Sequence, residues 1–153
     1  LKLPVGQGLW PAFWLLGADI GSTGWPACGE IDIMEYRGQE PRVVHGSLHG
    51  PGYSGGSAVT HRFELPRGRF DTDFHVFAVD WTEDAIRWSV DGTTFATATP
   101  ADLPPGTTWV FGHPFFVILN VAVGGSFVGG PDASTVFPQT MTVDYVRVYA
   151  PAP

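Results

Sequence analysis

The feature that most limits the fold of this chain is the even spread of glycine and proline along it. The 153 residues include 20 glycines and 14 prolines, and only residues 69–91 run for more than a dozen positions without either. In a helix interior, glycine costs about 1 kcal/mol and proline about 3 kcal/mol relative to alanine. The spacing therefore excludes an all-helical protein and favours short strands joined by turns.

Seven segments have the composition and the side-chain alternation of β-strands. They are separated by turn residues, among which Asp91-Gly92 is a strong hairpin signal. The predicted strands are residues 8–16, 29–36, 42–49, 74–81, 86–90, 115–123 and 141–149. This spacing predicts an all-β, antiparallel sandwich or barrel. A short helix at residues 82–86 is compatible with the pattern, but nothing requires it.

Composition and charge exclude several classes of protein. The hydrophobic fraction is 44%, with 11 Phe, 6 Trp and 4 Tyr, which excludes disorder. No apolar run approaches the roughly 18 residues of a membrane span, so no membrane partner is expected. The net charge of −7 argues against nucleic acid as a partner. The single cysteine, Cys28, excludes an internal disulfide and is interpreted as a small buried residue.

Three carboxylates lie within six residues of the predicted strand 29–36. Glu30 and Asp32 point to the same face, because strand side chains alternate. Glu35 has the opposite parity, and a one-residue bulge near Ile33-Met34 would return it to that face. Two carboxyl groups about 5 Å apart suit a retaining glycosidase, in which one attacks the sugar and the other protonates the leaving oxygen. Asp32 between them would raise the pKa of a neighbouring acid.

The spacing alone leaves two alternatives open. The acids also fit a solvated edge strand on which all three face water. A divalent cation held by the three carboxylates and a nearby histidine is a third interpretation. Closely spaced acids on one strand leave few open directions around an ion, which disfavours the metal site.

The acidic strand and its surroundings together resemble glycoside hydrolase family 16 in its laminarinase-like form, which has the extra residue in this strand. The resemblance rests on a series of segments that follow one another in order. They are residues 8–14 (GLWPAFW), 25–29 (WPACG), 29–35 (GEIDIME), 44–50 (VHGSLHG), 74–81 (FHVFAVDW), 119–125 (LNVAVGG) and 143–149 (VDYVRVY).

The resemblance implies a concanavalin A-like jelly-roll sandwich whose concave sheet binds a glucan. It implies Glu30 as nucleophile, Asp32 as assisting acid and Glu35 as general acid and base in a retaining double displacement. The implied activity is endo-acting hydrolysis of laminarin-type β-1,3-glucan, with no cofactor required. Mixed-linkage β-glucan or agar-type galactan as substrate, and a non-catalytic glycan-binding jelly roll, are the alternatives.

The resemblance also bears on domain boundaries and location. It implies that residues 1–150 are the C-terminal two thirds of one catalytic domain, incomplete at its N-terminus, with residues 151–153 as a tail. Because a glucan cannot enter a cell intact, secretion is expected. A monomer is expected if the domain is complete.

Indole rings stack on the apolar faces of sugars, so three tryptophans are candidate binding residues. Trp25 precedes Glu30 by five residues and resembles the family's tryptophan beside the cleaved sugar. Trp14 and Trp10 share one parity and face either the cleft or the core.

Polar residues on two further predicted strands are also candidates. Ser47 and His49 share a face with His45, and His49 is expected to bind a sugar hydroxyl or orient Glu35. Asn120 interrupts an apolar run, and a buried amide needs partners that a cleft would supply. Tyr53 is interpreted as a residue of a surface loop more than as a sugar contact.

The resemblance implies one metal ligand and one departure from the family pattern. Asp144 matches a family position that binds a structural calcium ion, although the other ligands are not in this sequence. After Gly124-Gly125, Ser126-Phe127 stands where close relatives have Asn-Trp, which predicts altered sugar stacking there.

Overall fold

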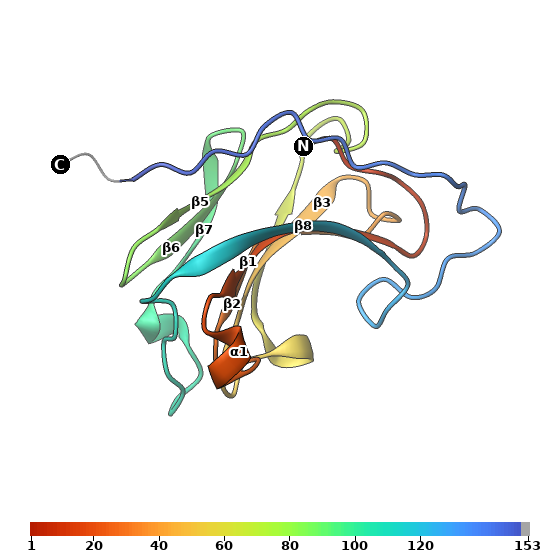
Figure 1. The fold of residues 1–153 in the computed structure, drawn as a ribbon. Coiled ribbons are helices and arrows are strands. Elements are labelled where there is room, and N and C mark those ends of the chain that lie inside the picture. Colours follow the sequence, from red (N-terminus) through yellow and green to blue (C-terminus); the bar gives the residue numbers. More distant parts are fainter. Residues whose placement is uncertain (151–153) are drawn as a thin grey trace.

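The structure, a computed structural model, describes residues 1–150, and the predicted tail at 151–153 lies outside the described part. Strands dominate these residues and form two antiparallel sheets (Figure 1). Their bounds are Leu9–Gly17 (β1), Glu30–Tyr36 (β2), Val43–His49 (β3), Val59–Glu64 (β4), Phe77–Trp81 (β5), Ile86–Val90 (β6), Thr93–Ala98 (β7) and Phe115–Val123 (β8). One sheet has the order β4-β3-β2-β1-β8 and the other β5-β6-β7. The predicted all-β, antiparallel two-sheet architecture is confirmed.

Helical structure is limited to short turns within residues 1–150. They are α1 (Ile20–Thr23) and two 3-10 turns, η1 (Gly55–Ser57) and η2 (Pro100–Asp102). None of these is long and apolar enough to cross a membrane. No helix forms at residues 82–86, where Thr82 and Ala85 bond to each other across a tight turn into β6.

The core lies between the two sheets and is built from alternate side chains. Ile31 of β2 and Leu48 of β3 are fully buried and pack in one cluster with Ile86 and Trp88 of β6. Because neighbouring positions on a strand point to opposite faces, the residues beside them turn to the other face of the large sheet. The acids of β2 are among those residues.

Trp88 connects the small sheet to the strand that carries the acids. Its indole is fully buried, and its Nε1–H donates a 2.8 Å hydrogen bond to the backbone carbonyl of Asp32. The ring has room because Gly46 lies above it on β3. A Cβ atom at position 46 would come within 2.4 Å of Trp88 Cδ1, so only glycine fits there.

Six of the seven predicted strands are present, with shifts of a few residues at their ends, and two strands were not predicted. β7 completes the hairpin that Asp91-Gly92 indicated. β4 pairs with β3 from Val59 to Glu64, and exposed polar residues alternate along it with half-buried ones. Val59 and Phe63 pack against the core, so pairing and partial burial both support this strand.

The predicted strand at 141–149 is wrong for the described residues. Thr142 forms a single isolated bridge with Lys2, and the remainder has no ladder. Val148 and Tyr149 are 85% and 78% exposed. The segment alternates as a strand should, but a strand also needs a partner edge, and in the described structure only Lys2 pairs with this segment.

We expect Gly46→Ala to destabilise the protein because its methyl group would press on the buried Trp88 ring. Overpacking of this kind costs about 1–3 kcal/mol. Gly112→Ala is the matched control, since a Cβ there meets nothing within 4 Å. Urea unfolding measures both; equal free energies of unfolding for the two variants would contradict the packing argument.

Candidate active site

A β-bulge in β2 brings the three acids to one face of the large sheet. Asp32 pairs with Ser47 and Glu35 with His45, so β2 advances three residues where β3 advances two. On the other side, Trp14 pairs with Asp32 and Phe13 with Met34, which leaves Ile33 as the extra residue. The predicted bulge is confirmed, and it gives Glu35 the same orientation as the other two acids.

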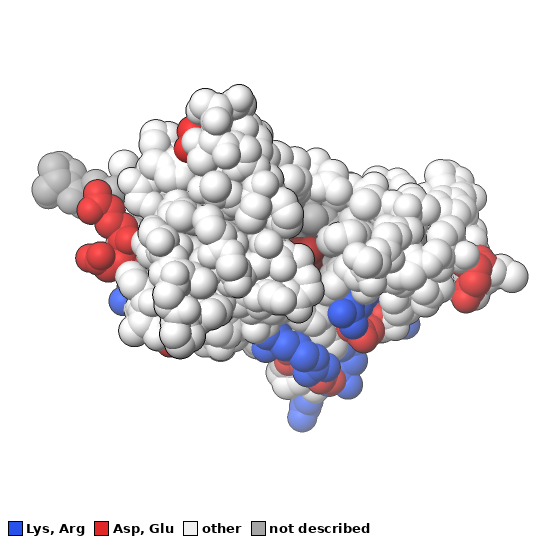
Figure 2. All heavy atoms as spheres, turned by 90° about the horizontal axis from the view of Figure 1, so that it is seen from below, with Lys and Arg blue, Asp and Glu red and all other residues white. Residues whose placement is uncertain are grey.

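The acids lie in a hollow of about 220 Å³ on the face of the sheet away from the core. Its walls come from β1, β2 and β8. The lining residues are Trp10, Ala12, Trp14, Glu30, Asp32, Glu35, Asn120 and Ala122. Figure 2 shows acidic atoms in a recess between surfaces without charged groups. The alternative of a solvated edge strand does not hold, because β2 is a central strand.

Glu30 is held from the side by Trp25. The Trp25 Nε1–H donates a 2.7 Å hydrogen bond to Glu30 Oε2. The indole itself is 48% exposed and lies 6.0 Å, centroid to centroid, from the His49 ring. Trp25 therefore fixes the carboxylate and presents an open aromatic surface at the same point.

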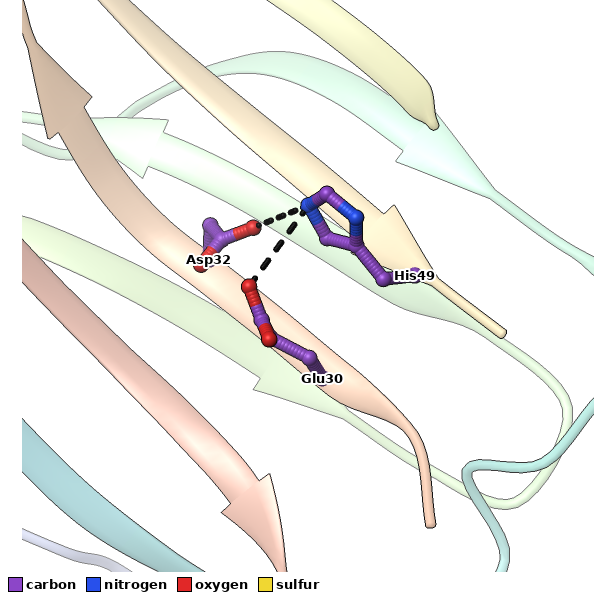
Figure 3. Close-up of side chains that lie close together, drawn as sticks. All are labelled: Glu30, Asp32 and His49. Atoms are coloured by element: carbon purple, nitrogen blue, oxygen red, sulfur yellow. Dashed lines mark ion pairs between the residues drawn. The ribbon is translucent and has the colours of Figure 1, made fainter. Parts of the chain in front are cut away.

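Asp32 is the most buried acid and is enclosed by ionisable neighbours. It is 2% exposed, and burial raises its pKa well above the ordinary value, followed by the charges of Glu35 and Glu30. Figure 3 shows Glu30, Asp32 and His49 pointing toward one another from β2 and β3. His49 Nε2 lies 3.0 Å from Asp32 Oδ2 and 3.6 Å from Glu30 Oε1.

Glu35 is held by two donors at opposite oxygens. Trp10 Nε1–H donates to Oε1 at 3.0 Å, and the Ser47 hydroxyl donates to Oε2 at 3.2 Å. Burial raises the pKa of Glu35, and the neighbouring His49, Ser47 and Trp10 offset this effect only in part. The raised pKa favours the protonated form of Glu35, which is the form that can give a proton to a bound molecule.

Trp14 and Asn120 form a second contact across the hollow. The Trp14 Nε1–H donates a 2.8 Å hydrogen bond to Asn120 Oδ1, from strands that pair directly. Asn120 is exposed, so the expectation of a buried amide is wrong, although the residue does line the hollow. Trp10 and Trp14 line the same hollow, and with Trp25 bonded to Glu30 all three predicted indoles lie beside the acids.

Other predicted residues lie elsewhere. Tyr53 is fully buried, and its hydroxyl donates to the Thr108 carbonyl, so both the surface-loop and the sugar-contact interpretations are wrong for its side chain. Cys28 is buried and free, as expected. His45 packs edge-on against Phe127 at 5.4 Å. Phe127 also lies 5.1 Å from Trp10.

Two contacts of the site were missed from the sequence. Thr60 Oγ1 lies 3.1 Å from Ser47 Oγ, because β4 pairs with β3 at this position. Gly55 donates its backbone N–H to His49 Nδ1 at 3.0 Å. No local pattern marks either residue; both depend on pairing or loop geometry.

Two places in the chain bear on metal binding: the cluster of Glu30, Asp32 and His49, and Asp144. Glu30, Asp32 and His49 each offer a ligand atom, and these atoms lie within 4.8 Å of one another. Metal-bound imidazoles usually donate their second ring N–H to an acceptor, whereas here His49 Nδ1 accepts. In residues 1–150, no group of three such ligands includes Asp144, so the calcium site implied at Asp144 stays a prediction.

The chain is similar to known glucanases over almost all its length. It is 44% identical to glucan endo-1,3-beta-glucosidase A1 of Niallia circulans over 97% of the chain and 23% of that protein. It is 42% identical to the beta-glucanase of Rhodothermus marinus over 97% of the chain and 54% of that protein. The chain thus spans about a quarter to a half of these relatives.

Solved structures of glucanases are also similar to this chain. The endo-beta-1,3-glucanase from Pyrococcus furiosus superimposes with a TM-score of 0.87 at 55% identity, covering 90% of this chain and 54% of that one. The laminarinase catalytic domain of Thermotoga maritima MSB8 has a TM-score of 0.87 at 53% identity, covering 90% and 56%. The model of the glycosyl hydrolases family 16 matches residues 1–147. With the acidic strand and both sheets inside that match, the chain belongs to glycosyl hydrolase family 16.

Proposed function

We propose that this chain carries the catalytic strand of an endo-acting β-1,3-glucan hydrolase that retains the anomeric configuration. The observation that carries the proposal is the acid arrangement. Three carboxyl groups face one hollow from a bulged strand, and the middle one is buried with a raised pKa. The tryptophans around them supply the apolar surfaces on which sugar rings stack.

The chemistry follows a double displacement. A Glu30 oxygen bonds to the anomeric carbon while the bond from that carbon to the leaving oxygen breaks and Glu35 gives this oxygen its proton. Glu35 then takes a proton from water, whose oxygen attacks the same carbon and releases Glu30. Two inversions at one carbon give retention. Asp32, kept protonated by burial, hydrogen-bonds Glu30 and limits the repulsion between the acids.

The choice of substrate rests on the names of the relatives and on the net charge of −7, which suits a neutral polysaccharide. The similar proteins named above are glucanases, and laminarin is the corresponding neutral glucan. One relative is named endo-1,3-1,4-beta-glycanase, and another is named beta-1,3-glucan-binding protein. The presence of all three acids favours hydrolysis over binding alone. We also propose secretion, because a glucan cannot enter a cell intact, a monomeric state if the domain is complete, and a structural calcium ion with Asp144 as one ligand.

We expect Glu30→Gln to lower laminarin hydrolysis by about a thousandfold or more, because an amide cannot act as the nucleophile. Binding of laminarin should persist, since the tryptophans are unchanged. Glu83→Gln, in the exposed turn before β6, is the matched control. Reducing-sugar release from laminarin, curdlan, lichenan and agarose measures activity and substrate together. Full activity in Glu30→Gln would reject the assignment.

A second experiment separates the nucleophile from the acid. Azide added to Glu30→Ala should form an α-glycosyl azide, because the small anion takes the place of the carboxylate and inverts the carbon once. Azide added to Glu35→Ala should instead yield the β-azide, by attack on the glycosyl-enzyme. NMR of the products distinguishes the two anomers, and reversed products would exchange the two roles.

We expect Ser47→Ala to move the alkaline limb of the kcat/KM profile to higher pH. The Ser47 hydroxyl stabilises the charged form of Glu35 and so lowers its pKa; removing it raises that pKa further. The general acid must be protonated, so activity is lost as pH rises through the pKa of Glu35. Ser89→Ala in β6 is the control, and a limb that moves to lower pH would contradict this role of Ser47.

A further inference from the structure

His49 lies between two of the acids, Asp32 and Glu30, and a loop outside the sheet. Its ring is 9% exposed and lies at the end of β3. One nitrogen, Nε2, lies 3.0 Å from Asp32 Oδ2 and 3.6 Å from Glu30 Oε1 (Figure 3). The other, Nδ1, accepts the Gly55 backbone N–H at 3.0 Å. The two sides of one imidazole thus contact a backbone donor and a pair of carboxyl groups.

These contacts are not symmetric, because the ring nitrogens of neutral histidine differ. One carries a proton and donates, and the other has a lone pair and accepts. Gly55 N–H can only donate, so Nδ1 must provide the lone pair and the proton is on Nε2. In the reverse tautomer, two N–H groups would face each other at Nδ1, and a lone pair would face carboxyl oxygens at Nε2.

We infer that the Gly55 amide selects the Nε2–H tautomer of His49 and makes this residue a positioning residue for the acids. The ring proton then lies on Nε2, the nitrogen that is 3.0 Å from Asp32 Oδ2 and 3.6 Å from Glu30 Oε1. Asp32 Oδ2 accepts no hydrogen bond in the described structure, so the Nε2 proton acts on this buried oxygen electrostatically, through its short distance. The catalytic part of this inference rests on the proposed function; the tautomer does not.

The same contact argues against a metal ion among Glu30, Asp32 and His49. An ion on Nε2 would require the ring proton to move to Nδ1. That proton would meet the Gly55 N–H head on. The loop therefore keeps the proton on Nε2 and disfavours a metal ion in this cluster.

The loop is built to present this amide. Gly50 and Tyr53 pair with each other through two backbone hydrogen bonds, and the Tyr53 hydroxyl anchors the turn to the Thr108 carbonyl. Gly55 follows with a φ of +55°, a conformation that glycine adopts without strain. The GPGYSGG segment thus acts on the acids through its backbone rather than through a sugar-binding side chain.

Nitrogen NMR of the intact protein with ¹⁵N-labelled histidine rings tests the tautomer directly. At neutral pH, His49 should show a pyridine-type Nδ1 and a pyrrole-type Nε2. Two other histidines serve as internal standards. His113 Nε2 faces the Cys28 carbonyl at 3.1 Å and should carry its proton there, whereas His75 Nδ1 faces Asp91 Oδ2 at 2.7 Å and should carry a proton on Nδ1. A proton on His49 Nδ1, or equal populations of both tautomers, would overturn the inference.

Two variants test the catalytic consequence. In His49→Gln, the side-chain amide nitrogen takes the place of Nε2 and keeps an N–H group beside the acids, so kcat/KM on laminarin should stay within about tenfold of wild type. In His49→Asn, the shorter amide replaces only the loop-facing atom, and kcat/KM should fall by about a hundredfold or more. Equal losses in the two variants would contradict the positioning role.

The NMR test of the tautomer and the activity test of the variants can give independent results. A wild-type protein inactive on every glucan would reject the proposed function, while its histidine spectrum still decides the tautomer. If either variant does not fold, as judged by circular dichroism, the wild-type spectrum alone decides whether Gly55 selects the Nε2–H form.

Discussion

The extra residue in β2, Ile33, is the constraint on which the site depends. Without it, alternation along the strand would point Glu35 into the core, where an unpaired charge is costly. With it, the Glu35 side chain reaches the indole of Trp10 and the hydroxyl of Ser47. The buried Trp88 of the opposite sheet supports this strand from below through the Asp32 carbonyl. One bulge therefore lets β2 turn its hydrophobic residues to the core and all three acids to the opposite face.

Crowding three acids into one hollow is unfavourable by itself, and the surroundings offset it in two ways. Trp25 donates a hydrogen bond to Glu30, and donors from Trp10 and Ser47 offset part of the burial-driven rise in the pKa of Glu35. Burial raises the pKa of Asp32 well above its ordinary value, which favours the neutral form of the middle acid. This division lets neighbouring carboxyl groups have different protonation states, which acid–base chemistry requires.

Much of the fold and of the site could be predicted from local patterns. Alternation located most strands, and the spacing of Glu30, Asp32 and Glu35 indicated the bulge, whereas the chemistry was implied by the resemblance. Two errors share one cause. The segment 141–149 alternates, but in the described structure only Lys2 pairs with it, and Tyr53 sits in a glycine-rich segment yet is buried. Pairing and burial are relations between distant segments, and a local pattern does not contain them.

The sequence by itself determined that three acids share one strand and that one extra residue separates Asp32 from Glu35. Only the tertiary structure decided that Trp10 and Trp14 face the acids rather than the core, and how those groups are held. It placed Thr60 against Ser47 and Gly55 against His49. These contacts use a hydroxyl group and a backbone amide, and every sequence contains many of both. Such groups acquire a role through position, because a hydrogen bond depends on distance and direction rather than on residue type.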